Sequence, residues 1–182
     1  MKFLINIIGV IAFIFVTSCG TLEKPVKGMA CHGSKYQSSK KFFRASGFGD
    51  SKDQATSKKK ALSNARAELS SSINVTMKNV EDNFVNSLET NNVETIREKF
   101  TGNIRTVLNQ KLSGSIITCE EYKFNKETQK YKTYVSVELS AKALADQIGK
   151  QLSRDEEIRV EFDYQQFQET FNAEMDKLGN KE

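Results

Sequence analysis

The chain has 182 residues, of which 38% are apolar and 27% are charged, so it is long enough to bury one hydrophobic core. Its only long apolar run, Phe3 to Val16, is too short for an ordinary membrane-spanning helix, which excludes a protein with several spans. Three cysteines and a single proline exclude a disulfide framework and a collagen-like repeat.

The net charge of +4 comes from outside the predicted folded part of the chain. Residues 41–182 hold 22 basic and 22 acidic residues, and the excess of lysine lies in the leader and in residues 20–40. A neutral domain behind a basic segment predicts a tether beside an anionic surface and not a phosphate-binding face. We therefore expect no nucleic-acid partner.

Residues 1–18 have the features of a lipoprotein signal peptide: a positive charge, the apolar run 3–16, and small residues before Cys19. The stretch 16–20 resembles a bacterial lipobox, which implies that Cys19 is acylated and becomes the first residue. Two or three acyl chains, at about 0.8 kcal/mol per buried methylene, would anchor the protein to a membrane. An ordinary secretory leader with a coincidental cysteine is the alternative. Gly20 favours the outer membrane, and the leader leaves both the periplasmic leaflet and the cell surface open.

Residues 19–41 are predicted to form the lipidated cysteine and a flexible tether, because they are rich in lysine, glycine and serine. Cys31 and His32 lie side by side, but no second pair of this kind completes a metal site, and we expect no metal. Once Cys19 is acylated, Cys31 and Cys119 remain. An oxidising envelope would permit a disulfide between them, although the sequence does not place their Cα atoms.

The pattern after the tether predicts a strand and then a long helix. Residues 42–49 form a short strand that closes in a glycine-rich turn, and Ser51 and Gln54 have the spacing of a capping box. Apolar residues three or four apart over 55–88 indicate one helix with a buried stripe. The turn at 47–49 lacks the third glycine of a dinucleotide-binding loop, so we interpret it as a strand-to-helix connection.

The same period of three and four predicts a second helix over residues 93–112. β-branched and aromatic residues then indicate a hairpin of strands 116–124 and 131–139. Alternation in the second strand places three apolar residues toward the helices, namely Val135, Val137 and Leu139. It places four others on the opposite face, namely Lys132, Tyr134, Ser136 and Glu138. Ser140 is predicted to cap a helix that ends at Leu152.

Residues 153–182 are predicted to form an acidic amphipathic C-terminal helix. The spacing of Ser153 and Glu156 fits a capping box, and residues 154–182 hold nine acidic and four basic residues. The apolar stripe of this helix is Val160, Tyr164, Phe167, Phe171, Met175 and Leu178, although residues 158–162 alternate and could form a strand instead.

The order of these elements resembles the Lpp-twenty family of bacterial lipoproteins. The residues that carry the likeness are 45–49 (ASGFG), 53–55 (DQA), 61–62 (AL), 65–69 (ARAEL), 73–80 and 134–139 (YVSVEL), together with the leader and its lipobox. The resemblance covers residues 42–152 and implies an α+β domain in which a small antiparallel sheet wraps a long helix. It implies an envelope lipoprotein without catalytic residues. The acidic tail is not part of the shared pattern.

We therefore predict an α+β fold in which an antiparallel sheet of about three strands packs on a long N-terminal helix, with further helices toward the C-terminus. His32 lies in the tether, so no Ser-His-Asp or Cys-His arrangement can form within the domain, and we expect neither an enzyme nor a cofactor. The predicted function is a non-enzymatic interaction or assembly module of the outer membrane, bound to the membrane by acyl chains on Cys19. Its expected partner is an envelope protein or a second copy of the chain. The alternative is a carrier for a small aromatic or lipidic ligand, held in a groove between sheet and helices.

Overall fold

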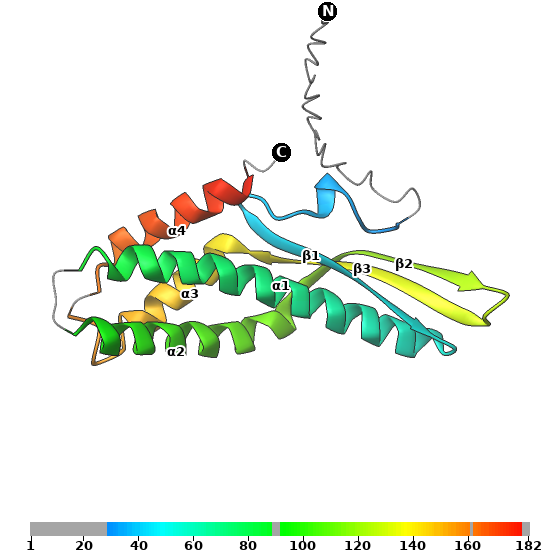
Figure 1. Cartoon of the computed structure of the whole chain (residues 1–182), viewed down its shortest axis with the longest axis horizontal. Helices are drawn as coiled ribbons and strands as arrows, with labels where there is room; N and C mark the ends of the chain where they lie inside the picture. Colours follow the sequence, from blue (N-terminus) through cyan, green and yellow to red (C-terminus); the bar gives the residue numbers. More distant parts are fainter. Residues whose placement is uncertain (1–28, 89–91, 161, 180–182) are drawn as a thin grey trace, which may run out of the picture.

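The computed structural model describes residues 29–88, 92–160 and 162–179 of the chain. The predicted α+β fold is confirmed: a three-stranded antiparallel sheet packs on one long helix, and the described residues form three further α-helices (Figure 1). In chain order the elements are η1 (Ser34–Tyr36), β1 (Phe42–Ser51), α1 (Gln54–Val85), α2 (Val93–Lys111), η2 (Leu112–Gly114), β2 (Ile116–Asn125), β3 (Lys130–Ser140), α3 (Ala141–Leu152) and α4 (Tyr164–Gly179).

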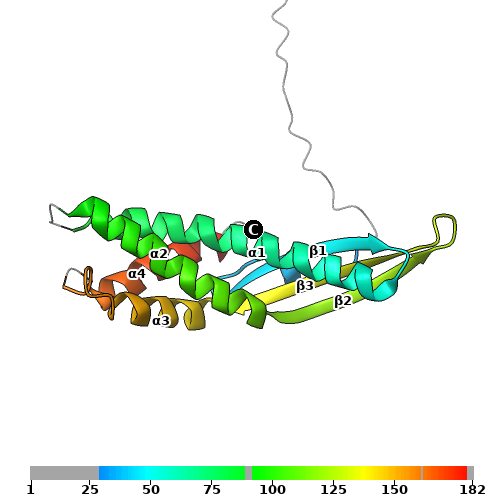
Figure 2. The same ribbon diagram turned by 90° about the horizontal axis from the view of Figure 1, so that it is seen from below.

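The sheet has the order β1-β3-β2, with β3 in the centre. Alternate residues of β3 face α1, and Val135 and Val137 on that face are fully buried, as the alternation predicted. We call the other side of the sheet the open face, since α1 packs only against the first side. Strands and helices occupy opposite halves of an elongated molecule, and only α1 extends along both halves (Figure 2).

Two glycines of β1 permit the close contact between α1 and the sheet. A Cβ atom on Gly47 would lie 2.4 Å from the backbone nitrogen of Ala65, and one on Gly49 would lie 2.6 Å from the backbone nitrogen of Ala61. The alanines of the helix and the glycines of the strand therefore let two backbones approach each other. The prediction of a turn over residues 47–49 is wrong: both glycines lie within the ten-residue strand, where the helix needs the space of a missing side chain.

Two of the three predicted helix caps are also wrong. The side chain of Asp53, not that of Ser51, caps α1 by accepting a hydrogen bond from the Thr56 nitrogen at 2.7 Å. The side chain of Asp163 accepts a hydrogen bond from the Gln166 nitrogen at 2.8 Å, directly before α4. The C-terminal helix thus begins about ten residues later than residue 153. Ser140 caps α3 as predicted.

Helix α4 belongs to the same core as the rest of the molecule and does not form an appended unit. Phe167 and Phe171 are at most 1% exposed. Their rings lie within 6.5 Å of those of Phe84, Phe100 and Phe43, which belong to α1, α2 and β1. Phe167 and Phe171 of the stripe predicted for this helix are therefore buried against three other elements, whereas Tyr164 of the same stripe is 40% exposed. Its first predicted member, Val160, lies before the helix and is 83% exposed.

Candidate functional site

A β-bulge determines on which face of the sheet Cys119 lies. Ile117 of β2 pairs with Val137, which faces α1, whereas Cys119 pairs with Ser136 on the open face, so that Thr118 is an extra residue. Because side chains alternate between the two faces, one extra residue reverses the face of the residues that follow it. The bulge therefore brings Cys119 to the open face.

A disulfide fixes the N-terminal segment to this cysteine. Cys31 and Cys119 are bonded, with their Cα atoms 5.5 Å apart, and the hydroxyl of Ser46 donates a hydrogen bond to the Cys31 carbonyl at 2.6 Å. Cys31 is only 4% exposed. The structure thus joins the two cysteines whose pairing the sequence left open. It also corrects the tether predicted for residues 19–41, because the chain from Cys31 onward is part of the fold.

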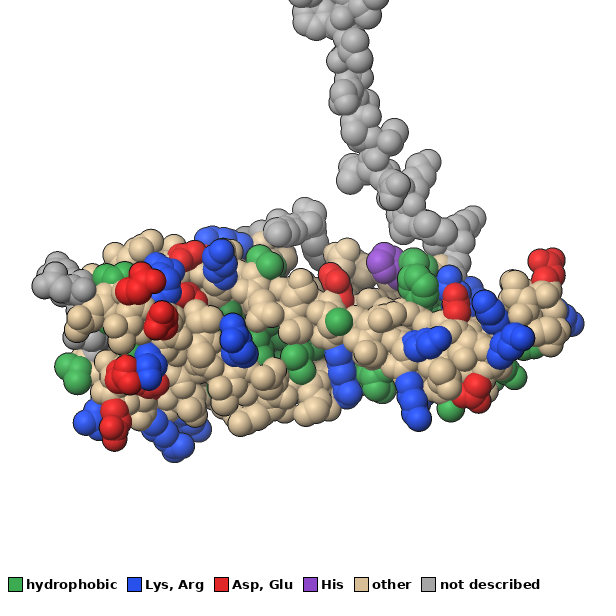
Figure 3. Space-filling model, turned by 60° about the horizontal axis from the view of Figure 1, so that its bottom comes forward, with side chains coloured by type: hydrophobic (Ala, Val, Ile, Leu, Met, Phe, Trp, Pro, Cys, Tyr) green, Lys and Arg blue, Asp and Glu red, His purple; other side chains and the backbone are tan. Residues whose placement is uncertain are grey.

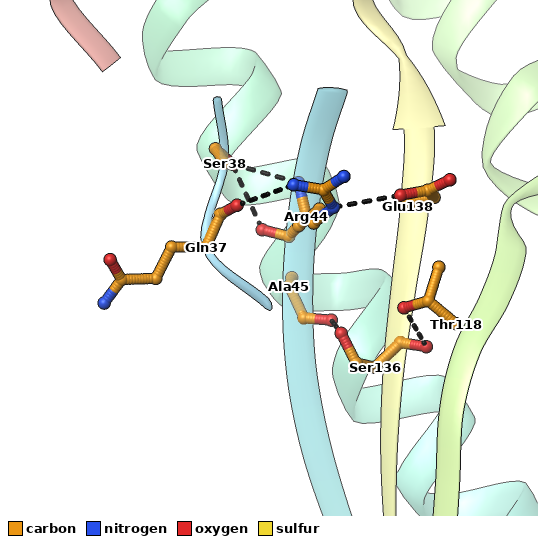
Figure 4. Close-up of polar contacts among 7 residues, drawn as sticks. All are labelled: Gln37, Ser38, Arg44, Ala45, Thr118, Ser136 and Glu138. Atoms are coloured by element: carbon orange, nitrogen blue, oxygen red, sulfur yellow. Dashed lines mark hydrogen bonds and ion pairs between the residues drawn. The ribbon is translucent and has the colours of Figure 1, made fainter. Parts of the chain in front are cut away.

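A second attachment lies at the free edge of β1 (Figure 4). The Ser38 hydroxyl accepts a hydrogen bond from the Arg44 nitrogen at 3.0 Å and donates one to the Arg44 carbonyl at 3.2 Å. The Arg44 side chain donates to Glu138 of β3 at 2.9 Å and to the Gln37 carbonyl at 3.4 Å. The Ser38 side chain thus makes the two hydrogen bonds with the Arg44 backbone that a neighbouring strand would make, and it covers part of the exposed edge of β1.

Polar side chains connect all three strands beneath the disulfide. The Ser136 hydroxyl donates to the Ala45 carbonyl at 3.3 Å, and the Thr118 hydroxyl donates to the Ser136 carbonyl at 3.4 Å (Figure 4). Ser136 lies on the open face, as predicted, yet its exposed fraction is 0%. We call residues 31–38, which Cys31 and Ser38 fix to the sheet, the attached segment. Ser136 pairs with Ser46 on one side and with Cys119 on the other, so the attached segment covers it. The attached segment therefore covers the middle of the open face.

A shallow hollow of about 490 Å³ lies beside the attached segment, at the edge of β1. Its lining includes His32, Tyr36, Arg44, Asn64 and Glu68. Within the described part of the chain, His32 has no hydrogen bond to a serine, a cysteine or a carboxylate, and no group of three metal-ligating side chains is found. This hollow thus offers neither an activated nucleophile nor a set of metal ligands.

The space between sheet and helices, where the alternative prediction placed a ligand, is filled by side chains. The largest of them are fully buried: Phe43, Phe84, Phe100, Phe167 and Phe171. The gap lined by Leu88, Ile96, Ile158 and their neighbours does not admit a water molecule. A groove of about 450 Å³ exists instead between α1 and α2. Glu81 in its wall is 7% exposed and already accepts a hydrogen bond from Thr101 at 2.8 Å. This groove lies between two helices and not between the sheet and the helices.

The predicted signal peptide and Cys19 lie outside the described residues. Among the helices that the structure describes, none is long and apolar enough to cross a bilayer. No protein-family model, curated protein or solved structure matches this chain.

Proposed function

We propose that the chain is an outer-membrane lipoprotein, acylated at Cys19, whose domain is a non-enzymatic interaction or assembly module. The observation that carries this proposal is the disulfide between Cys31 and Cys119. It fixes the segment that follows the lipobox onto the open face of the sheet. A structural disulfide suits the oxidising cell envelope, which is the compartment to which such a leader would direct the chain. The fold is also the one that the resemblance to the Lpp-twenty family implies.

The disulfide sets the length of the tether. Cys31 lies twelve positions after Cys19, and an extended chain spans at most about 3.3–3.6 Å per residue, so the tether reaches about 40 Å. Without the bond, the first fixed residues would lie further along the chain and the domain would move more freely. The proposed anchor therefore holds the open face of the sheet close to the bilayer.

Metabolic labelling with an alkyne fatty acid tests the anchor. We expect the wild-type chain to take up the label and to separate with outer membranes on a density gradient. Cys19→Ala should lose the label, and 0.5 M salt should release it from membranes that retain the acylated wild type. The double variant Cys31→Ala, Cys119→Ala is the matched control, because it removes the other two cysteines and should keep the label. Label on Cys19→Ala, or a soluble unlabelled wild type, would contradict the proposal.

Protease shaving of intact cells then distinguishes the two leaflets that the leader leaves open. Digestion of the domain in intact cells, with a periplasmic control protein unharmed, would mean display on the cell surface and a partner outside the cell. Protection of the domain until the outer membrane is opened would mean a periplasmic module whose partner belongs to the envelope.

A further inference from the structure

The end of the β2–β3 hairpin has an unusual composition. We call residues 122–132 the hairpin tip; this stretch contains four lysines, three aromatic residues and one acidic residue, Glu127. The tip extends past the first turn of α1 and forms the end of the molecule opposite the α1–α2 connection (Figure 1). Lysine and aromatic side chains are thus concentrated where the fold ends.

Three aromatic rings cluster on the face of the tip that belongs to the same side of the sheet as α1. Tyr122 is 57% exposed and Phe124 is 44% exposed. Their ring centroids lie 6.3 Å and 4.9 Å from that of Tyr131 on the neighbouring strand. The rings contact each other across the strands, yet the core of the domain does not cover them. They present apolar area together with two tyrosine hydroxyl groups to the surroundings.

Next to the tip, the open face of the sheet also combines aromatic rings with ammonium groups. Phe48 is 43% exposed, and the ammonium group of Lys132 lies 4.4 Å from the centre of its ring. The ammonium groups of Lys132 and Lys123 each lie 5.8 Å from the ring centre of Tyr134. Basic side chains are gathered over the strand end of the molecule, with fewer acidic ones between them (Figure 3). The register thus places the three rings of the tip on the side of α1 and its strand lysines, Lys123, Lys130 and Lys132, on the open face.

We propose that the hairpin tip docks on the surface of an anionic lipid bilayer. Aromatic rings with a polar end prefer the membrane–water interface, and each lysine near an anionic surface adds electrostatic attraction. A partner protein would cover one face of a flat surface, whereas a projecting ribbon with exposed rings on one face and lysines on the other suits a headgroup layer that surrounds it. The single acidic residue of the tip, Glu127, opposes four lysines, which gives the charge complementarity that an anionic bilayer requires.

The geometry of the proposed anchor is compatible with this docking. Cys119 carries the tether and lies six residues before Asn125, where β2 ends, a distance of about 20 Å along an antiparallel strand. The tether of about 40 Å derived above is longer than this distance. A domain attached through Cys19 can therefore place its tip on the same bilayer. The docking proposal rests on the proposed function for this proximity, but its test does not need the acyl chains.

Vesicle flotation tests the proposal with a chain that begins at Gly20, which retains every residue that the structure describes and lacks the acylated cysteine. We expect it to float with vesicles of phosphatidylglycerol and phosphatidylcholine and not with phosphatidylcholine alone. The triple variant Lys123→Gln, Lys130→Gln, Lys132→Gln should bind about a hundredfold more weakly, at about fivefold per lysine, and 0.5 M salt should weaken wild-type binding. Tyr122→Ser with Phe124→Ser should reduce binding at either salt concentration.

The matched control removes the same charge from the helical half of the molecule, by Lys78→Gln, Lys150→Gln and Arg159→Gln, and should keep at least a third of the wild-type affinity. Equal losses in both triple variants would overturn the proposal in favour of unspecific charge attraction. Self-association through the tip without vesicle binding would overturn it in favour of a second copy. Unchanged melting temperatures verify that the variants fold. If the chain does not bind the vesicles but Cys19 is still labelled by the fatty acid, the docking proposal is refuted and the proposed function is not.

Discussion

Replacing Gly47 by alanine tests the close contact between β1 and α1. The added Cβ would lie 2.4 Å from the Ala65 nitrogen and 2.8 Å from the Ala61 carbonyl oxygen. Both are backbone atoms of a helix, so no side-chain rotation can relieve the overlap. Ordinary van der Waals contact between a Cβ and a backbone atom begins at about 3.4 Å. The helix would therefore have to move about 1 Å away from the sheet, and a close-packed core resists this movement.

We expect Gly47→Ala to lower the free energy of unfolding by about 3 kcal/mol or more, at the upper end of the range for overpacked cores, because the displaced atoms are backbone. For a chain of this length, each 1 kcal/mol shifts the melting temperature by about 2–4 °C, so the midpoint should fall by roughly 6–12 °C. Scanning calorimetry and urea unfolding followed by circular dichroism measure both quantities.

Gly102→Ala is the matched control, since it makes the same chemical change within α2. No atom beyond the adjacent backbone of α2 lies within 4 Å of a Cβ at this position, and alanine favours a helix over glycine by about 1 kcal/mol. The melting temperature of this variant should therefore rise by about 2–4 °C. A Gly47→Ala variant that melts within 1 °C of the wild type would refute the argument that α1 contacts the strand backbone.

Three further predictions follow from the buried bonds. Replacing Cys31 and Cys119 by serine should lower the free energy of unfolding by about 2–4 kcal/mol, because the bond connects residues 88 positions apart; reductant should destabilise the wild type in urea and leave the variant unchanged. The hydrogen bond from Asn103 holds the pKa of Asp155 below its ordinary value. The ionised Asp155 carboxylate therefore stabilises the fold above the unfolded pKa of about 4, and this contribution is lost as the pH falls through the folded pKa. Asp155→Asn lacks the titrating group, so urea titrations should show a smaller loss of stability between about pH 5 and pH 2 in this variant. Glu174 is 3% exposed and accepts hydrogen bonds from two asparagines, so Glu174→Ala should cost about 1–3 kcal/mol in thermal unfolding, and more than Glu174→Gln.

The order of helices and strands could be predicted from the sequence because burial imposes a period on the chain. The stripe of α1 illustrates this relation, since Ala61, Ala65, Leu69 and Ile73 recur every four residues and all have an exposed fraction of 0%. The stripe of α4 was predicted for the same reason. Such patterns depend only on which face of an element meets the core, and a single sequence contains that information.

The caps and the bulge could not be predicted in the same way. Asp53 lies only two residues from Ser51, and either side chain can accept a hydrogen bond from a helix nitrogen. Which one does so depends on where β1 ends, and the two glycines lengthen that strand beyond the predicted turn. The bulge at Thr118 has no signal in the alternation of β2, because residues on both faces of this edge strand are largely exposed. The attachment of Cys31 depends on that bulge.

The bulge and the hairpin tip are the two features that orient the domain in the proposed arrangement. The bulge turns Cys119 to the open face and thereby places the end of the tether there. The hairpin tip begins three residues later on the same strand. An edge strand that contributes little to the core can thus carry both the covalent and the electrostatic attachment to a bilayer, while α1 and the remaining strands provide stability. Substitutions in the tip should therefore change membrane affinity without changing the melting temperature, whereas Gly47→Ala should do the reverse.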